Sequence, residues 1–171
     1  MRYARKHRGP FGRDARGAAI LEMAVILPVL LTIGLGVFEF GNLIYRYHLI
    51  TVGVRDGARY IAGLPQADDS GNSLVAGNET AAKNIAIYGT TGTSTPRVSW
   101  WNDPTTMIAI NYTNVPNDNG SGVKLYRGGA NIVLVTMSTN VEYQPLGFLG
   151  FLGLGTITLH AQHEERLFGV R

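Results

Sequence analysis

Residues 18–38 read AAILEMAVILPVLLTIGLGVF, and the only formal charge among these 21 residues belongs to Glu22. As an α-helix this stretch is about 31 Å long at ~1.5 Å per residue, which matches the ~30 Å hydrocarbon thickness of a bilayer. A helix that is apolar on every side is rarely needed by a small soluble domain. At 171 residues the chain is sized for one modest domain plus a membrane segment, so this stretch predicts a membrane-spanning helix.

The residues before this stretch are strongly basic. Residues 1–17 hold six Lys or Arg side chains against one Asp, a net charge of +5, which leaves −2 for the rest of a chain whose total is +3. Basic flanks of a membrane helix stay in the cytoplasm. We therefore expect the leader inside and the residues after Gly41 outside, in the periplasm of a two-membrane bacterium. Because the basic charge belongs to the leader, the folded part is not expected to bind nucleic acid.

A cleaved secretory signal is the alternative interpretation of the first 40 residues. The apolar region of such signals usually spans ~7–15 residues and ends at a small-x-small site. Here the run is longer, and no convincing site of that kind follows it. Pro28 is tolerated in a membrane helix, so we expect an anchor that is retained. The absence of cysteine is compatible with a periplasmic domain.

The acid inside the predicted span follows a glycine at a fixed distance. Glu22 is the fifth residue after Gly17, and type IV prepilins share this arrangement of basic leader, glycine and apolar helix with glutamate at its fifth position. Cleavage after Gly17 would create a cationic amino terminus at Ala18, about 6 Å along the helix axis from Glu22. A neighbouring subunit's terminal amine would then neutralise a carboxylate whose burial in hydrocarbon costs roughly 2.5–3.5 kcal/mol. The alternative is that Glu22 lies shallow and reaches the headgroup layer.

Three further stretches of sequence indicate a more specific family within this group. They are residues 22–28 (EMAVILP), 36–41 (GVFEFG) and 54–60 (VRDGARY). These stretches resemble the TadE-like family, whose members are minor pilins or pseudopilins of the Tad (Flp) tight-adherence pilus system. The chain departs from the family pattern at Met23, where an aromatic residue is usual, and at Asp56, where Glu is usual.

The resemblance implies a role for each residue of the N-terminal pattern. Gly17 and Ala18 would flank the bond that a dedicated prepilin peptidase, an intramembrane aspartic protease, cuts. Glu22 would be needed for processing or assembly. The implied partners are other pilins or pseudopilins and the pilus assembly machinery, and the implied function is structural support of surface adhesion.

The chain is expected to divide into four segments. These are a basic cytoplasmic leader (1–17), a transmembrane helix (18–40), its periplasmic continuation (41–63) and a periplasmic α+β domain (64–171). Apolar residues at steps of three and four predict that the continuation packs against the domain: Phe40, Leu43, Ile44, Tyr47, Ile50, Val54, Ala58 and Ile61. The residues expected at the outer membrane boundary are Glu39, Tyr45, Arg46 and Tyr47.

The fold class is predicted as α+β and pilin-like, with the long helix packed on a small antiparallel sheet and one further short helix. The short helix is expected over residues 80–88, ended by Gly89. A turn cluster is expected over residues 117–122. The expected strands of the three- or four-stranded sheet are residues 98–101, 107–112, 131–143 and 156–168, the last two as antiparallel partners.

Two apolar features are candidate partner contacts. The connection 145–155 is apolar and punctuated by glycine, whereas loops usually face water. It forms either a contact surface for partner pilins, the secretin region or the membrane, or a loop folded beneath its own sheet. Alternation along a strand would turn one of two adjacent tryptophan rings outward. The candidate contact residues are Trp100, Trp101, Phe148, Leu149, Phe151 and Leu152.

The sequence lacks the motifs of common catalytic sites: a cysteine nucleophile, Gly-x-Ser-x-Gly, and a phosphate-binding glycine loop with lysine. His160 and His163 would point to opposite faces of a strand, which argues against a metal site between them. The acidic turns at residues 68–72 and 117–120 do not match a calcium-binding loop with its terminal acid. We therefore expect a structural protein without cofactor or metal. The alternatives are an uncleaved periplasmic scaffold of the same apparatus and a membrane-tethered enzyme or sugar-binding domain.

Overall fold

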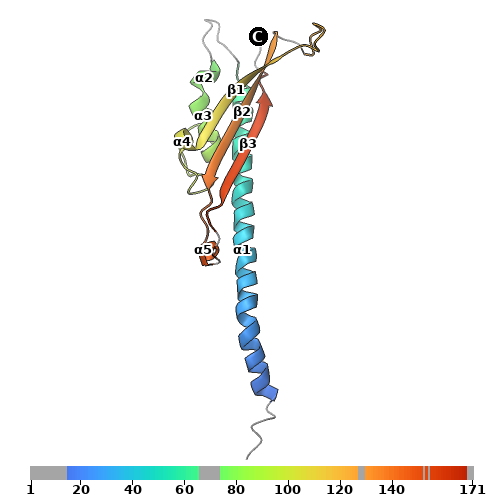
Figure 1. The fold of residues 1–171 in the computed structure, drawn as a ribbon. Coiled ribbons are helices and arrows are strands. Elements are labelled where there is room, and N and C mark those ends of the chain that lie inside the picture. Colours follow the sequence, from blue (N-terminus) through green and yellow to red (C-terminus); the bar gives the residue numbers. More distant parts are fainter. Residues whose placement is uncertain (1–14, 66–73, 127–129, 152, 154, 169–171) are drawn as a thin grey trace, which may run out of the picture.

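The computed structural model describes residues 15–65, 74–126, 130–151, 153 and 155–168 (Figure 1). Its main element is helix α1 (Ala15–Ala62), which runs for 48 residues and is about 70 Å long at ~1.5 Å per residue. The predicted end of this helix before Gly63 is confirmed. The other elements gather around the C-terminal part of α1, and together with that part they form what we call the body (Figure 1).

A three-stranded antiparallel sheet forms one layer of the body. Its order is β1–β2–β3, where β1 is Ile108–Pro116, β2 is Asn131–Glu142 and β3 is Thr158–Arg166. Alternate residues of β2 and β3 face the core, as the sequence pattern predicts. The buried residues of these two strands include Val135, Met137, Val141, Leu159 and Ala161. The predicted α+β class with one antiparallel sheet is confirmed.

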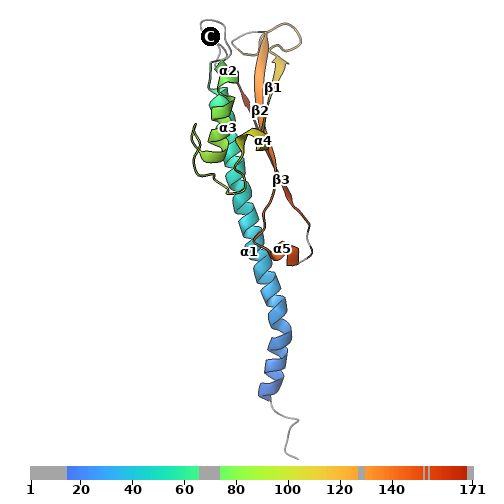
Figure 2. The same cartoon turned by 90° about the vertical axis from the view of Figure 1, so that its left-hand side faces the viewer.

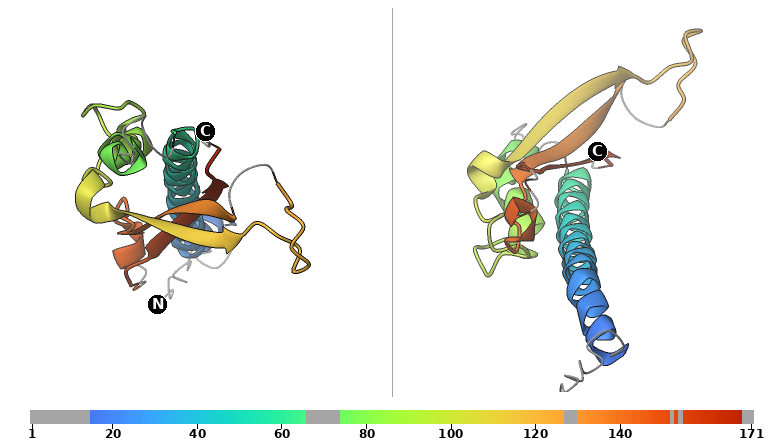
Figure 3. Two further views of the ribbon diagram at one scale, coloured as in Figure 1. Left: turned by 90° about the horizontal axis from the view of Figure 1, so that it is seen from above. Right: turned by 60° about the horizontal axis from the view of Figure 1, so that its bottom comes forward.

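In the described part of the chain, four short helices complete the body: α2 (Leu74–Gly77), α3 (Glu79–Tyr88), α4 (Pro104–Met107) and α5 (Phe148–Phe151). Helix α3 confirms the helix predicted before Gly89. Gly89 has a φ of 76°, and this left-handed conformation lets its N–H donate to the Ile85 carbonyl at 2.9 Å. Seen along α1, the sheet covers one side of the long helix and α3 lies beside it (Figure 3).

Two glycines bring α1 and α3 into backbone contact. A Cβ added at Gly53 would lie 2.3 Å from the Ala86 carbonyl oxygen, and one at Gly57 would lie 2.7 Å from the Ala82 carbonyl oxygen. The Cβ at Gly57 would also lie 2.7 Å from Sδ of Met137 on β2. A methyl group does not fit within such distances of a backbone oxygen, so the spacing of α1 from its neighbours requires glycine at both positions.

Trp101 fills the centre of the core between α1, α3 and the sheet. Its side chain is fully buried, and its Nε1–H donates to Oγ1 of Thr139 at 3.1 Å. The Thr139 hydroxyl in turn donates to the Met107 carbonyl at 2.6 Å. The polar atoms that this large side chain brings into the core are therefore paired.

The strand predicted at residues 98–101 is wrong. These residues form a tight turn in which the Trp101 N–H donates to the Val98 carbonyl at 2.9 Å. An extended chain would carry the two tryptophans past the core, whereas the turn directs Trp101 against Gly53 of α1. Burial of the indole ring thus outweighs the strand propensity of this segment.

The packing face of the long helix also differs from the prediction around residues 40–47. Phe40, Ile44 and Tyr47 are exposed and do not pack on the body. The covered side of α1 instead follows Glu39, Ile50 and Ile61, which are buried and spaced by 11 residues, about three helical turns. The apolar residues at steps of three and four belong to two faces of the helix, one buried against the body and one exposed. The sequence pattern alone does not distinguish these two faces.

Candidate functional site

The N-terminal half of α1 extends beyond the body and exposes apolar side chains (Figures 1 and 2). Ile20, Leu30 and Phe38 are all exposed, Phe38 to 76%. Within the described residues, α1 is the one helix long and apolar enough to cross a membrane, and its most apolar window is entirely unburied. By length and composition, α1 is a candidate membrane span.

The residues predicted for processing and assembly lie near the free end of this helix. Gly17, Ala18 and Glu22 are all exposed on α1. A Cβ added at Gly17 would meet nothing within 4 Å. The Gly17–Ala18 bond and the Glu22 carboxylate are therefore accessible to a second molecule, and no part of the body covers them.

Glu39 is buried where the body meets the exposed half of α1. Its side chain is 1% exposed, and its Oε1 accepts hydrogen bonds from the Tyr143 hydroxyl at 2.9 Å and from the Leu146 N–H at 3.0 Å. The Tyr143 oxygen accepts from Nδ2 of Asn42 at 2.6 Å, and Oδ1 of Asn42 accepts from Nε of Arg46 at 3.4 Å. This chain of hydrogen bonds, from Arg46 to Glu39 and Leu146, is called the junction network below.

Within the junction network, two donors reach the Glu39 carboxylate directly: the Tyr143 hydroxyl and the Leu146 N–H. Burial raises the pKa of Tyr143, opposed by its bond from Asn42 and reinforced by Glu39. The phenol therefore stays neutral and acts as a donor to the acid. Arg46 supplies a positive charge at the far end of the same chain. Among the described residues, Oε2 of Glu39 is buried without a hydrogen-bond partner, so Oε1 carries the pairing of this buried acid.

We expect replacement of Glu39 by alanine to lower the free energy of unfolding by about 1–3 kcal/mol, because it leaves the buried Tyr143 hydroxyl and the part-buried Leu146 N–H without this acceptor. A double-mutant cycle of Glu39→Ala with Tyr143→Phe, measured by urea unfolding in detergent, should give a coupling energy of about 1 kcal/mol or more. The matched control is Tyr112, whose hydroxyl donates to Oε1 of Glu79, also at 2.9 Å, in an exposed setting. Its cycle should give a coupling below about 0.5 kcal/mol. Equal coupling in the two cycles would contradict a buried role for Glu39.

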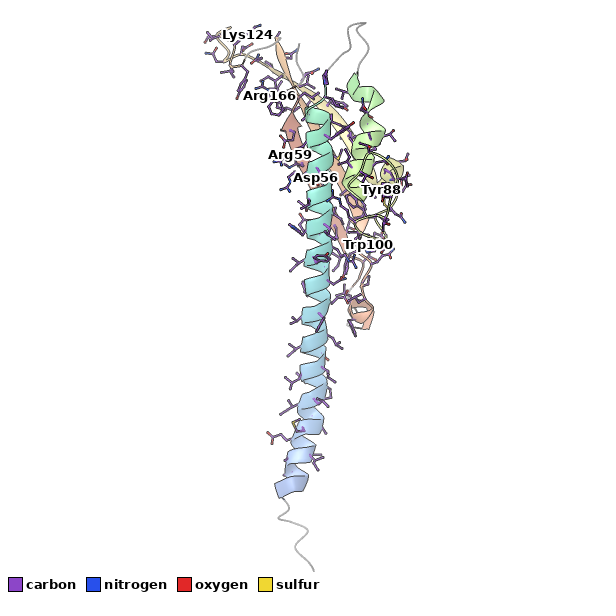
Figure 4. All side chains as sticks on the ribbon, turned by 180° about the vertical axis from the view of Figure 1, so that it is seen from behind. Asp56, Arg59, Tyr88, Trp100, Lys124 and Arg166 are labelled. Atoms are coloured by element: carbon purple, nitrogen blue, oxygen red, sulfur yellow. The ribbon has the colours of Figure 1, made fainter. Side chains whose placement is uncertain are left out.

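The stretch 54–60 of α1 fastens the helix to the rest of the body. Oδ2 of Asp56 pairs with Nη2 of Arg97 at 2.8 Å, and Nε of Arg59 pairs with Oε1 of Glu165 on β3 at 3.2 Å. Asp56 and Arg59 lie on the C-terminal part of α1 (Figure 4). Hydrogen bonds from His163 and from Arg59 hold the pKa of Glu165 below its usual value, against the opposing effect of burial. Charged residues of this stretch thus bind two separate segments to the helix.

Residues 17–59 match the family model described as TadE-like protein. This N-terminal segment is TadE-like. The match begins at the exposed Gly17, includes Glu22 and Glu39, and ends at Arg59, so it covers α1 almost to its C-terminal end. Comparison with curated proteins and with solved structures found no match.

The TadE-like segment combines three structural features described above. It contains the exposed apolar half of α1, the buried Glu39 of the junction network, and the glycines Gly53 and Gly57 at which α3 approaches. The match relates residues 17–59 to the TadE-like family. The sheet and α3 lie outside the matched residues, which means that the relationship rests on the helix and not on the remainder of the body.

The predicted partner contacts divide into buried and partly exposed residues. Trp101 and Leu149 are buried in the body, so neither side chain is available to a partner, and that expectation is corrected for both. Trp100 is half-buried, and its ring packs edge-to-face on Tyr143 with ring centroids 6.1 Å apart. Phe148 is half-buried as well. The Phe151 side chain and Leu152 lie outside the described residues.

The two histidines lie on opposite faces of β3, as the sequence predicts. His160 faces outward beside Oδ1 of Asn140, whereas His163 lies on the other face of β3 against Glu165. In the part of the chain that the structure describes, no three His, Asp or Glu side chains lie close enough together to hold a metal ion. In the predicted turn cluster, Oδ1 of Asp118 accepts from the Gly120 N–H at 2.8 Å, which makes this residue part of a backbone turn. Residues 68–72 lie outside the described residues.

Sequence reasoning placed Glu39 only at the membrane boundary and missed its burial in the body. The signal that could have found it is the spacing of 11 residues from Glu39 to Ile50 and again to Ile61, which puts an acid in line with two core residues. An acid on a packing face needs a hydrogen-bond donor from another segment. Tyr143 supplies that donor from 104 residues further along the chain, a distance over which sequence periodicity carries no information.

Proposed function

We propose that this chain is a minor pilin or pseudopilin that takes part in the assembly of a Tad-type pilus. The observation that carries the proposal is the TadE-like match over residues 17–59. The role is structural and not enzymatic. The TadE-like helix would supply packing against other subunits in the membrane, and the body would select the partners.

The exposed half of α1 supports a place in the cytoplasmic membrane. With the basic leader in the cytoplasm, α1 crosses the bilayer once and carries the body into the periplasm. Glu22 is then the only formal charge within the hydrocarbon. Because an unpaired acid there is costly, Glu22 favours side-by-side packing with a subunit whose amino terminus lies at the same depth.

Processing by a prepilin peptidase is the step that creates this amino terminus. Cutting the Gly17–Ala18 bond removes the arginine-rich leader and leaves a free amine one helical turn from Glu22. The body does not cover this bond, which makes it accessible to an enzyme within the membrane.

N-terminal sequencing of the protein from its native host tests the proposal. We expect the mature chain to begin at Ala18 and the Gly17→Val variant to keep its leader, because a branched side chain would crowd the bond that the peptidase is proposed to cut. The fold itself tolerates the change, since a Cβ at this position meets nothing within 4 Å. The control is Gly34→Val, at a position that is equally open and lies within the span. It should be processed normally. A native chain that still begins at Met1 would favour an uncleaved scaffold instead.

A further inference from the structure

The junction network fixes the height of the loop that follows β2. The Leu146 N–H and the Tyr143 hydroxyl both donate to Oε1 of Glu39, so the backbone at Leu146 lies level with Glu39 on α1. Buried Leu149 secures the same loop against the body. Helix α5 follows directly, and two perpendicular views place it alongside α1 at the membrane end of the body (Figures 1 and 2).

That height coincides with the outer edge of the predicted span. Ala18 and Glu39 are separated by 21 residues, about 32 Å at ~1.5 Å per residue, which equals the hydrocarbon thickness of a bilayer. When the span fills the hydrocarbon, Glu39 is at its periplasmic boundary. Leu146 is therefore held at the same boundary, because its N–H bonds directly to Glu39.

The loop has the surface chemistry of a segment that meets lipid. Residues 145–157 contain no charged side chain. Leu146 is 60% exposed although it is a large apolar residue, and Phe148 is half-buried. On α1 at the same level, Phe38 and Phe40 are exposed too. The apolar surface of the span thus continues from the helix onto the loop without an intervening charge.

We propose that residues 145–148 rest in the outer leaflet of the membrane that α1 spans, as a second lipid contact of the same chain. This inference rests on the proposed membrane span. Two features favour lipid over a second protein chain as the occupant: the loop is fixed at the boundary by its own chain, and its exposed apolar surface is continuous with that of the span. The role of the junction network is then to keep the Glu39 acid away from hydrocarbon while it holds the loop at this depth.

The test uses the full chain, which contains no cysteine, so that a fluorophore can be attached at one introduced position at a time. The variants are Leu146→Cys, Phe40→Cys and Val123→Cys, reconstituted in phosphatidylethanolamine–phosphatidylglycerol vesicles with or without lipids brominated near the headgroup end of the acyl chain. Val123 is the matched control because it is also 60% exposed but lies in the turn segment after β1, at the other end of the body. Circular dichroism verifies that each labelled chain is folded.

We expect the fluorophore at position 146 to be quenched about twofold or more, as at position 40, because an interfacial segment lies roughly 5–10 Å into the boundary of headgroups and acyl chains. The fluorophore at position 123 should remain unquenched. Quenching at position 40 without quenching at 146 would overturn the second contact and leave the span intact. Shielding of position 146 from aqueous iodide without lipid quenching would assign this surface to another protein chain and overturn the inference as well. Absence of quenching at position 40 would overturn both the span and the inference.

Discussion

Replacing Gly53 with alanine is expected to lower the free energy of unfolding of the body by about 3 kcal/mol, the upper end of the usual cost of overpacking. The new methyl group would lie 2.3 Å from the Ala86 carbonyl oxygen and 2.9 Å from the ring of Trp101. Neither neighbour is the free end of a flexible side chain: one is helix backbone and the other is an indole that fills the core. Relief therefore requires α3 to move away from α1. Gly57→Ala should have a similar effect through Ala82.

The control for this prediction is Gly41→Ala on the same helix. A Cβ at Gly41 would meet nothing within 4 Å, so the substitution should be neutral or should stabilise the helix by roughly 0.5–1 kcal/mol, the usual gain for glycine to alanine in a helix interior. Urea unfolding in detergent, followed by tryptophan fluorescence, measures all three variants. If Gly53→Ala were as stable as Gly41→Ala, α1 and α3 would not be in backbone contact.

Replacing Glu22 with alanine is expected to reduce pilus assembly in the native host by about tenfold or more. Under the proposed function, this carboxylate is neutralised in the membrane by the amino terminus of a neighbouring subunit, an interaction that offsets a burial cost of roughly 2.5–3.5 kcal/mol. Membrane insertion should be unchanged, because alanine makes the span more apolar. Electron microscopy of sheared filaments, together with immunoblots of the membrane fraction, separates assembly from insertion.

Thr32→Val provides the control for Glu22. Thr32 is a polar residue of the exposed half of α1, and its hydroxyl donates to the Pro28 carbonyl of the same helix. Its replacement removes a polar group from the span without removing the charge, so piliation should persist. Normal piliation in the Glu22→Ala strain would remove the assembly role from this residue, whatever the position of cleavage.

Local patterns predicted most of the elements of this fold. The apolar stretch at residues 18–38, the helix end before Gly63 and the alternation of residues 131–143 each depend on neighbours within a few turns or a few strand positions. Such patterns can be recognised in a single sequence because side chains repeat with a fixed period along a helix or a strand. The TadE-like resemblance could be recognised from the sequence for the same reason, since its motifs all lie on a single helix.

Contacts between distant segments could not be predicted in this way. The turn at residues 98–101 exists because Trp101 enters a space opened by Gly53, and the burial of Glu39 depends on Tyr143 and Leu146. Each of these outcomes is decided by a partner far along the chain. Gly53 and Gly57 indicate close packing, because two glycines four residues apart on one helix face allow another segment to approach closely. The sequence does not specify which segment that is.

The single helix α1 passes from the exposed half into the body and ends only at Ala62. The junction network holds the body to α1 at one level, and the ion pairs of Asp56 and Arg59 hold it at positions further along the helix. These separate contacts fix the orientation of the body about the helix axis. A torque or an axial pull on the exposed half of α1 is therefore transmitted directly to the body. Under the proposed function, the side of α1 on which neighbouring subunits pack in the membrane therefore sets the direction in which the body faces.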